Sequence, residues 1–281
     1  MYSIVRHATP REFLAINGNF IYSDYFRHYH LINVIDKLHS GATELHDYFS
    51  IVEDGELRIF VLWTRDGYYI YGRGWGNEVL PLLSERIGEE IERRVFCGES
   101  ELIKALFRSN QIDFEVFKNR LLEECREANP ANGRFTGEMA HAEIDDSEEI
   151  IQMELAYYRE EFRGGGRMKD EGVAATAMQG IIDGTIFTWR VEDRIVGIIS
   201  IINDDQEQPM LGSLFTKPDR RGNGYAYFLL HTLTSRLLET GSLRCGLVAD
   251  QDNNITSRVF LKVGYQSIYR WCSLSRRHED E

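Results

Sequence analysis

One short segment of the chain combines glycines with basic side chains in a spacing that suits an anionic ligand. It reads Lys217-Pro218-Asp219-Arg220-Arg221-Gly222-Asn223-Gly224 and follows an apolar run that ends at Leu214-Phe215-Thr216. Glycines let the backbone approach a ligand closely, and free N–H groups at the start of a helix suit a phosphate. Three cations stand here against one acid, although the whole chain has a formal net charge of -13. We therefore expect a phosphate-bearing ligand.

The elements around this segment are predicted as a strand before it and a helix after it. Leucines spaced along one face indicate a helix over residues 226–237, which Gly241 can cap. The second half of the chain is predicted to be α/β throughout. Its expected helices are 147–162, 171–183, 226–237 and 255–263, and its expected strands are 185–191, 195–202, 210–216, 243–249 and 265–274.

Two well-known phosphate loops do not match the glycine segment. The run lacks the third glycine of a dinucleotide fingerprint, and no GxxxxGK[ST] occurs in the chain. Arg221-Gly222-Asn223-Gly224-Tyr225-Ala226 instead resembles the [Q/R]-x-x-G-x-[G/A] signature of the GNAT acetyltransferase superfamily. The flanking strand and helix, and the stretch from Ala249 to Tyr265, resemble the same family in the same order. The resemblance extends from Glu138 to Leu274; the alternative is a glycine turn that merely links a strand to a helix.

This resemblance implies acetyl-CoA, or another acyl-CoA, as the cofactor. The backbone of the strand end would pair with the pantetheine arm, the loop amides would hold the pyrophosphate, and Asn254 would reach the arm from the next helix. The fold that it implies is a mixed sheet flanked by helices. The implied cofactor-binding residues are Leu214, Phe215, Thr216, Arg220, Arg221, Gly222, Asn223, Gly224, Tyr225, Ala226 and Asn254.

The resemblance also implies a reaction in which an amine attacks the thioester directly. The family often uses a tyrosine to protonate the departing thiolate, but Phe260 stands at that position. Tyr265 is the nearest candidate acid, at a place where the family often has a core aromatic. The remaining options are a water, another side chain, unaided departure of the thiolate, or a domain that binds acyl-CoA without turnover. Glu154 is the candidate base, with a solvated surface glutamate as the alternative.

The chain is expected to contain two domains, since Asn129-Pro130-Ala131-Asn132-Gly133 would end a helix predicted over residues 114–126. The predicted domains are an α/β domain over 1–130 and the acyl-CoA domain over 136–275. The first should hold a hairpin over 56–63 and 67–71 and a helix over 78–93. Its run from Tyr69 to Asn77 weakly resembles the glycine loop, with a strand that leads into glycines and then a helix. The first domain is therefore either a degenerate GNAT-like duplicate without a second cofactor site, or the run is simply a glycine-rich strand end.

Composition narrows the partners further. The negative charge disfavours general binding to nucleic acid or to an anionic membrane, and fits a cationic acceptor such as a small amine or the lysine or N-terminus of a peptide. No stretch approaches the length of a membrane helix. Four separated cysteines without a CxxC pair, and histidines at 28, 30, 39 and 46 without an HxxxH pair, predict no metal site. We expect a cytoplasmic protein.

Overall fold

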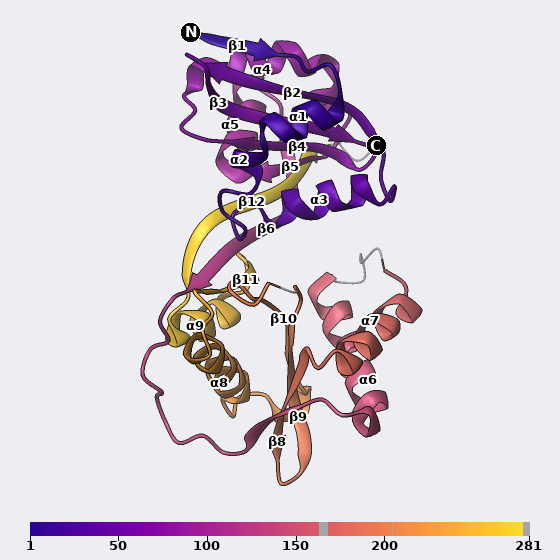
Figure 1. Ribbon diagram of the computed structural model, residues 1–281, viewed down its shortest axis with the longest axis vertical. Coiled ribbons are helices and arrows are strands. Elements are labelled where there is room, and N and C mark those ends of the chain that lie inside the picture. Colours follow the sequence, from indigo (N-terminus) through magenta and orange to yellow (C-terminus); the bar gives the residue numbers. More distant parts are fainter. Residues whose placement is uncertain (163–167, 204, 278–281) are drawn as a thin grey trace. The chain divides into compact units, whose positions relative to one another are not determined.

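A computed structural model describes residues 1–162, 168–203 and 205–277, which form a mixed α/β fold. The chain divides into two compact units, shown with all elements labelled in Figure 1. Unit 1 comprises Met1–Leu122, Asp250–Asp252 and the chain from Ser267 onward. Unit 2 comprises Glu123–Ala249 and Asn253–Gln266. The carboxyl-terminal strand, predicted to belong to the second domain, is therefore mostly part of unit 1.

Unit 1 is a sheet with helices packed against it. In spatial order its strands are β1 (Tyr2–Val5), β2 (Leu45–Glu53), β3 (Glu56–Thr64), β4 (Gly67–Gly72), β5 (Phe96–Glu99), β12 (Gln266–Arg276) and β6 (Phe114–Cys125). Its helices are α1 (Pro10–Ile16), α2 (Gly18–Ile21), α3 (Tyr29–His39), η1 (Asn77–Val79), α4 (Leu80–Ile87), η2 (Gly88–Glu92) and α5 (Ser100–Ser109). Leucines of α4 and α5 pack with Ile70 and Phe96 in its core.

Three predictions for this half have different outcomes. The hairpin is confirmed as β3 and β4. The helix expected over 78–93 is interrupted because Gly88 has a φ of +60°. The helix expected over 114–126 is wrong, since this segment is strand β6, placed beside β12 in the sheet. Half-buried Phe114 and Val116 alternate there with exposed Glu115, the two-residue period of a strand.

Unit 2 contains a sheet covered by helices on both faces. In spatial order its strands are β11 (Cys245–Asp250), β10 (Met210–Thr216), β9 (Arg194–Ile201), β8 (Ile186–Val191) and β7 (Glu138–His141). Its helices are η3 (Ile144–Asp146), α6 (Ser147–Phe162), α7 (Asp170–Ile182), η4 (Pro218–Arg220), α8 (Tyr225–Glu239) and α9 (Asn254–Val263). Figure 1 shows α6 and α7 on one side of the sheet and α8 and α9 on the other.

The cores of unit 2 follow this layering. Ile150 and Met153 of α6 pack with Ile198 and Phe215 of the sheet. On the other face α8 buries Leu229, Leu230 and Leu233. The elements predicted for this half are confirmed to within a few residues, and α6 ends at Phe162 as expected. The glycine-rich break predicted after it, at residues 163–167, lies outside the described residues.

Candidate functional site

The strand before the glycine loop has an unpaired edge. Strand β10 runs parallel to β11, and within the described residues the two pair only at Met210 and Leu211. On its other side β10 pairs with β9 at Gly212 and Phe215, with a bulge between them that leaves Ser213 and Leu214 without register partners. Ser213 has a φ of +51°, an uncommon conformation for a residue other than glycine. The backbone beyond Leu211 is therefore open on the side of β11.

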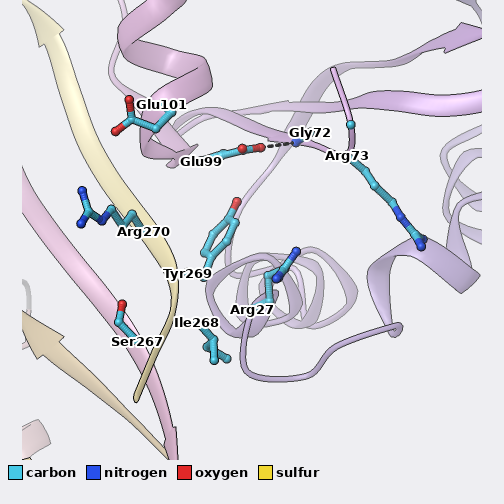
Figure 2. A pocket seen from close by; sticks show the side chains of 10 residues that line it. Arg27, Gly72, Arg73, Glu99, Glu101, Ser267, Ile268, Tyr269 and Arg270 are labelled. Carbon is cyan, nitrogen blue, oxygen red and sulfur yellow. Dashed lines mark hydrogen bonds between the residues drawn. The ribbon is translucent and has the colours of Figure 1, made fainter. Parts of the chain in front are cut away.

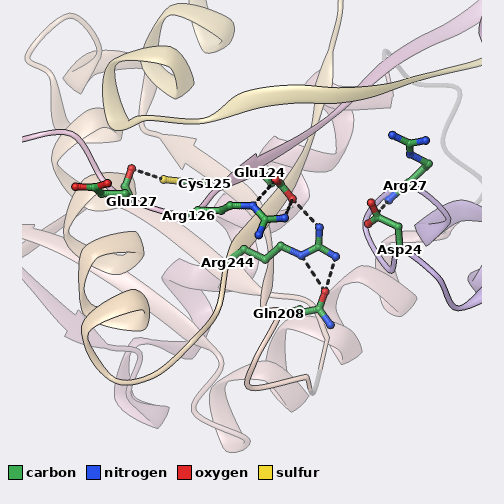
Figure 3. Close-up of polar contacts among 8 residues, drawn as sticks. All are labelled: Asp24, Arg27, Glu124, Cys125, Arg126, Glu127, Gln208 and Arg244. Carbon is green, nitrogen blue, oxygen red and sulfur yellow. Dashed lines mark hydrogen bonds and ion pairs between the residues drawn. The ribbon is translucent and has the colours of Figure 1, made fainter.

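A partly buried ion pair holds the closed end of this opening. Arg244, just before β11, donates to Glu124 at 2.6 Å and to the side-chain oxygen of Gln208, just before β10, at 2.6 and 2.9 Å (Figure 3). Arg126 also donates to Glu124, at 2.7 Å. Burial alone would raise the pKa of Glu124, but the hydrogen bonds from the two arginines outweigh it and lower the pKa. The network fixes the point from which β10 and β11 diverge.

The glycine loop presents its backbone to solvent. Gly222 and Gly224 have φ values of +82° and +81°, which glycine adopts without steric cost, and both are exposed. The first backbone hydrogen bond of α8 is made by the N–H of Phe228, which donates to the carbonyl of Gly224 at 3.0 Å. In the described part of the chain, the N–H groups of residues 222–227 have no backbone acceptor. Six backbone donors at or just before the start of α8, where the helix dipole is positive, are therefore free of backbone acceptors.

The side chain of Arg221 is engaged within unit 2 rather than directed freely at this place. Its guanidinium donates to both carboxylate oxygens of Glu160 on α6, at 2.8 and 2.9 Å, and to the carbonyl of Thr216 at 3.0 Å. It also lies over the ring of Phe215, 5.4 Å from the centroid. Arg221 thus fixes the shape of the loop, and what it offers a ligand directly is its backbone.

The other two cations are paired as well. Lys217 forms an ion pair with Glu149 of α6, and Arg220 pairs with Asp219 at 3.3 Å. The predicted excess of positive charge at the loop is therefore largely offset, because α6 contributes acids that lie far away in the sequence. Exposed pairs of this kind contribute only about 0–1 kcal/mol each, so an anionic ligand can replace the glutamates as partner.

Glu154 lies beside the bulge of β10. It is on α6, its exposed fraction is only 8%, and it accepts a hydrogen bond from Ser200 of β9 at 3.1 Å. Burial raises its pKa, opposed by hydrogen bonds from Ser213 and Ser200. The alternative of a solvated surface glutamate is therefore wrong. A carboxylate whose pKa is raised by burial, next to an open strand edge, is suited to accept a proton.

Tyr265 occupies the core of unit 2. Its exposed fraction is 1%, and its hydroxyl forms a 2.9 Å hydrogen bond with Thr234 of α8. Burial raises its pKa well above the ordinary value. Phe260 is also buried and packs near Tyr265, with ring centroids 6.3 Å apart. These positions argue against the expectation that Tyr265 acts as the acid, and agree with its reading as a core aromatic.

The remaining predicted site residues lie on β10, α8 and α9. Asn254 is the exposed first residue of α9, and its neighbour Asn253 caps this helix by accepting from the N–H groups of Ile255 and Thr256. Leu214 is half-buried in the bulge. Tyr225 and Ala226 form the partly buried first turn of α8. The predicted strand end and loop are thus adjacent, joined by η4.

Comparison with known proteins finds a family similarity within unit 2. The model of the acetyltransferase (GNAT) family matches residues 148–265. Residues 148–265, less than half of the chain, are thus similar to the GNAT family. This GNAT domain is 31% identical over 97 residues to uncharacterized N-acetyltransferases of Mycobacterium bovis and Mycobacterium tuberculosis. The match covers 34% of this chain and 62% of those proteins, and so spans less than two thirds of their length.

Solved structures agree on the fold. An acetyltransferase from the GNAT family of Colwellia psychrerythraea matches 99% of this chain and 100% of its own, with a TM-score of 0.62 and 14% identity. A GCN5-related N-acetyltransferase from Sphaerobacter thermophilus matches 84% of this chain and 82% of its own, with a TM-score of 0.58 and 16% identity. The predicted GNAT-like mixed sheet flanked by helices is confirmed. None of the helices in the described ranges is long and apolar enough to cross a membrane.

Proposed function

We propose that the GNAT domain binds an acyl-CoA, such as acetyl-CoA, and transfers the acyl group to an amine. The observation that supports this most strongly is the combination of an unpaired strand edge with a set of free loop amides. Strand β10 opens beyond Leu211, and residues 222–227 present N–H donors a few residues later in the chain. An extended chain can add to an open strand edge, and a pyrophosphate suits the start of a helix.

The binding mode follows from these two features. The pantetheine arm pairs with the backbone of Leu214 to Thr216, and the pyrophosphate accepts hydrogen bonds from the loop amides between Gly222 and Ala226. The side chain of Asn254 reaches the arm from the start of α9. Arg220 and Lys217, held at the surface by weak ion pairs, turn toward the phosphates when the ligand arrives.

Two groups of the chain serve the reaction in this proposal. The bulged backbone near Leu214 supplies an N–H to the thioester carbonyl, where negative charge develops. Glu154 accepts the proton from the attacking amine, directly or through a water. The new C–N bond replaces the C–S bond, and the sulfur leaves as thiolate. We assign no side chain to its protonation, because Tyr265 is in the core and Phe260 has no proton to donate.

The cofactor proposal is tested by thermal unfolding with and without acetyl-CoA. A ligand at about one hundred times its Kd stabilises a protein by roughly 2.7 kcal/mol. Gly224→Glu should abolish this shift, because the added carboxylate repels the diphosphate. Gly55→Glu is the matched control, since Gly55 has a φ of +84°, has open space beside it, and lies in unit 1. Absence of a shift in the wild type at millimolar acetyl-CoA would refute the assignment.

A second function is favoured by one observation, the buried Phe260 where the family often has its acid. In that alternative the domain senses acyl-CoA without turning it over. A panel of small amines and lysine peptides separates the two, with release of free thiol as the readout. Turnover that survives Phe260→Ala but not Gly224→Glu supports the transferase. Tight binding without turnover across the panel supports the sensor.

A further inference from the structure

Unit 1 repeats the arrangement that forms the acyl-CoA site of unit 2. Strands β3 and β4 are antiparallel, β4 and β5 are parallel, and α4 lies between β4 and β5 in the sequence. Strands β9, β10 and β11 and helix α8 have the same order and directions. The last recorded pair between β4 and β5 joins Ile70 to Gly98, so these strands also end beside an opening.

The loop after β4 cannot hold a diphosphate as the loop after β10 can. The N–H of Gly72 donates to Glu99 at 2.9 Å, and the N–H of Arg73 donates to the carbonyl of Arg58 on β3 at 2.8 Å. Trp75 fills the remaining space, because a Cβ on Gly72 would lie 2.4 Å from its ring. The amides of Gly72 and Arg73 are taken and the strand end is covered, so this end of β4 differs from the open end of β10.

A cavity of about 500 Å³ remains at the ends of β4 and β5. It lies entirely within unit 1 and is drawn in Figure 2. Its lining includes Arg27, Arg73 and Arg270, together with Tyr269 of β12 and Glu99. Its volume falls in the range of sites that hold small molecules. Glu101 also lines the cavity, so its charged side chains are three arginines and two glutamates.

The hydroxyl of Tyr269 is an unused donor at this cavity. It is shielded from solvent and has no hydrogen-bond partner among the described residues. The ring is held from two sides, by Tyr71 with centroids 6.2 Å apart and by the guanidinium of Arg27 at 5.6 Å from its centroid. In Figure 2 the hydroxyl points toward the carboxylate of Glu99. A buried donor without an acceptor costs free energy, which a ligand can recover.

The side-chain charges that line this cavity are predominantly positive, three arginines against Glu99 and Glu101. Arg27 and Arg73 form no ion pair with a carboxylate in the described ranges. Glu99 cannot attract a cation equally well, because one of its oxygens accepts from Gly72 and the other from the indole of Trp75 at 3.2 Å. Guanidinium groups bind carboxylates and phosphates with charge-assisted hydrogen bonds. The cavity therefore suits an anion.

We propose that this cavity binds a small molecule bearing a carboxylate or phosphate group. Arg27 and Arg73 pair with its anionic oxygens, and the Tyr269 hydroxyl donates to it. The site is separate from the acyl-CoA site in unit 2 and does not depend on the function proposed there. The rest of the cavity accommodates the body of the ligand against the ring of Tyr269.

The experiment is calorimetric titration of the full chain carrying Gly224→Glu, so that the loop of unit 2 does not contribute. Inorganic phosphate and acetate are the two probes. We expect saturable binding of at least one, weakened about tenfold or more by Arg73→Gln, the loss expected for a charge-assisted hydrogen bond. Tyr269→Phe should weaken it as well. Arg11→Gln, an exposed arginine of α1, is the control for net charge and should have no effect.

Each outcome of the titration is decisive. Saturation by phosphate alone assigns a phosphorylated ligand, and saturation by acetate alone assigns a carboxylic acid. If Arg11→Gln and Arg73→Gln weaken binding of the probe equally, the anion is attracted only by the net charge of the protein, and the proposal is overturned. Absence of saturation by both probes at millimolar concentration would overturn it too. Far-ultraviolet circular dichroism and a thermal unfolding curve for Arg73→Gln verify that the variant is folded.

Discussion

Replacing Glu154 by glutamine tests the proposed base most directly. Glutamine has the same shape and keeps an oxygen that can accept from Ser200, so the packing of α6 on β9 should survive. It cannot take up a proton. A positioned general base contributes about 10²–10⁴-fold to a rate, so kcat/KM should fall by that factor, or roughly 2.7–5.4 kcal/mol. Acetyl-CoA binding, measured by thermal shift, should be unchanged.

The pH profile gives a second readout of the same variant. Burial raises the pKa of Glu154, so the wild-type rate should rise with pH through this raised pKa, and Glu154→Gln should lose that limb. The rate rises with pH, but the free energy of unfolding of the wild type should fall over the same pH range. Because the folded state binds this proton more tightly than the unfolded state, the wild type loses stability as pH rises through the raised pKa. The variant should therefore become more stable relative to wild type as the pH increases.

A matched control is available on the same helix. Glu148 is exposed in the first turn of α6, and Glu148→Gln removes one negative charge without touching the site. It should leave both the rate and its pH profile unchanged. If Glu154→Gln keeps wild-type turnover and an unaltered profile with an amine that is acetylated, the assignment of Glu154 as base is wrong.

Three further outcomes are expected. Tyr265→Phe should leave turnover intact and cost about 1–3 kcal/mol by denaturant unfolding, since it removes a buried hydrogen bond; a large loss of rate would restore Tyr265 as acid. Arg244→Met should destabilise unit 2 by up to about 3 kcal/mol at neutral pH. The difference in unfolding free energy between variant and wild type should shrink as the pH falls through the lowered pKa of Glu124, because its ion pair with Arg244 stabilises unit 2 only while Glu124 is ionised. Gly98→Ala should prevent unit 1 from folding, as its Cβ would lie 2.0 Å from the carbonyl oxygen of Ile70; a normal unfolding curve would contradict this.

The features that could be predicted from the sequence are local ones. The loop from Arg221 to Ala226 was recognisable because left-handed backbone favours glycine and because the helix after it has leucines along one face. Helix α6 could be predicted for the same reason. The open edge of β10 followed only from the family resemblance, since a two-residue ladder leaves no mark in the sequence.

The features that were missed depend on distant partners. Glu154 was predicted as the candidate base, but its burial was not. The residues that enclose it, Ser200 and Ser213, come from strands β9 and β10, and the sequence around Glu154 does not reveal these partners. The acids that offset the loop cations, Glu149 and Glu160, come from a helix more than one element away. Segment 114–125 was mistaken for a helix although Phe114, Glu115 and Val116 alternate with the two-residue period of a strand; its neighbour in the sheet, β12, lies near the other end of the chain.

The position of β12 has a consequence for how the protein is made. Strand β5 pairs with β12 from Phe96–Leu274 to Glu99–Trp271, so the sheet of unit 1 gains this strand only after all of unit 2 has been synthesised. Contacts between such distant residues slow folding, and a growing chain exposes the edge of β5 meanwhile. The strands β7 to β11 of unit 2 do not wait for β12. During synthesis unit 2 therefore has its strands available before unit 1 does, although unit 1 begins first in the sequence.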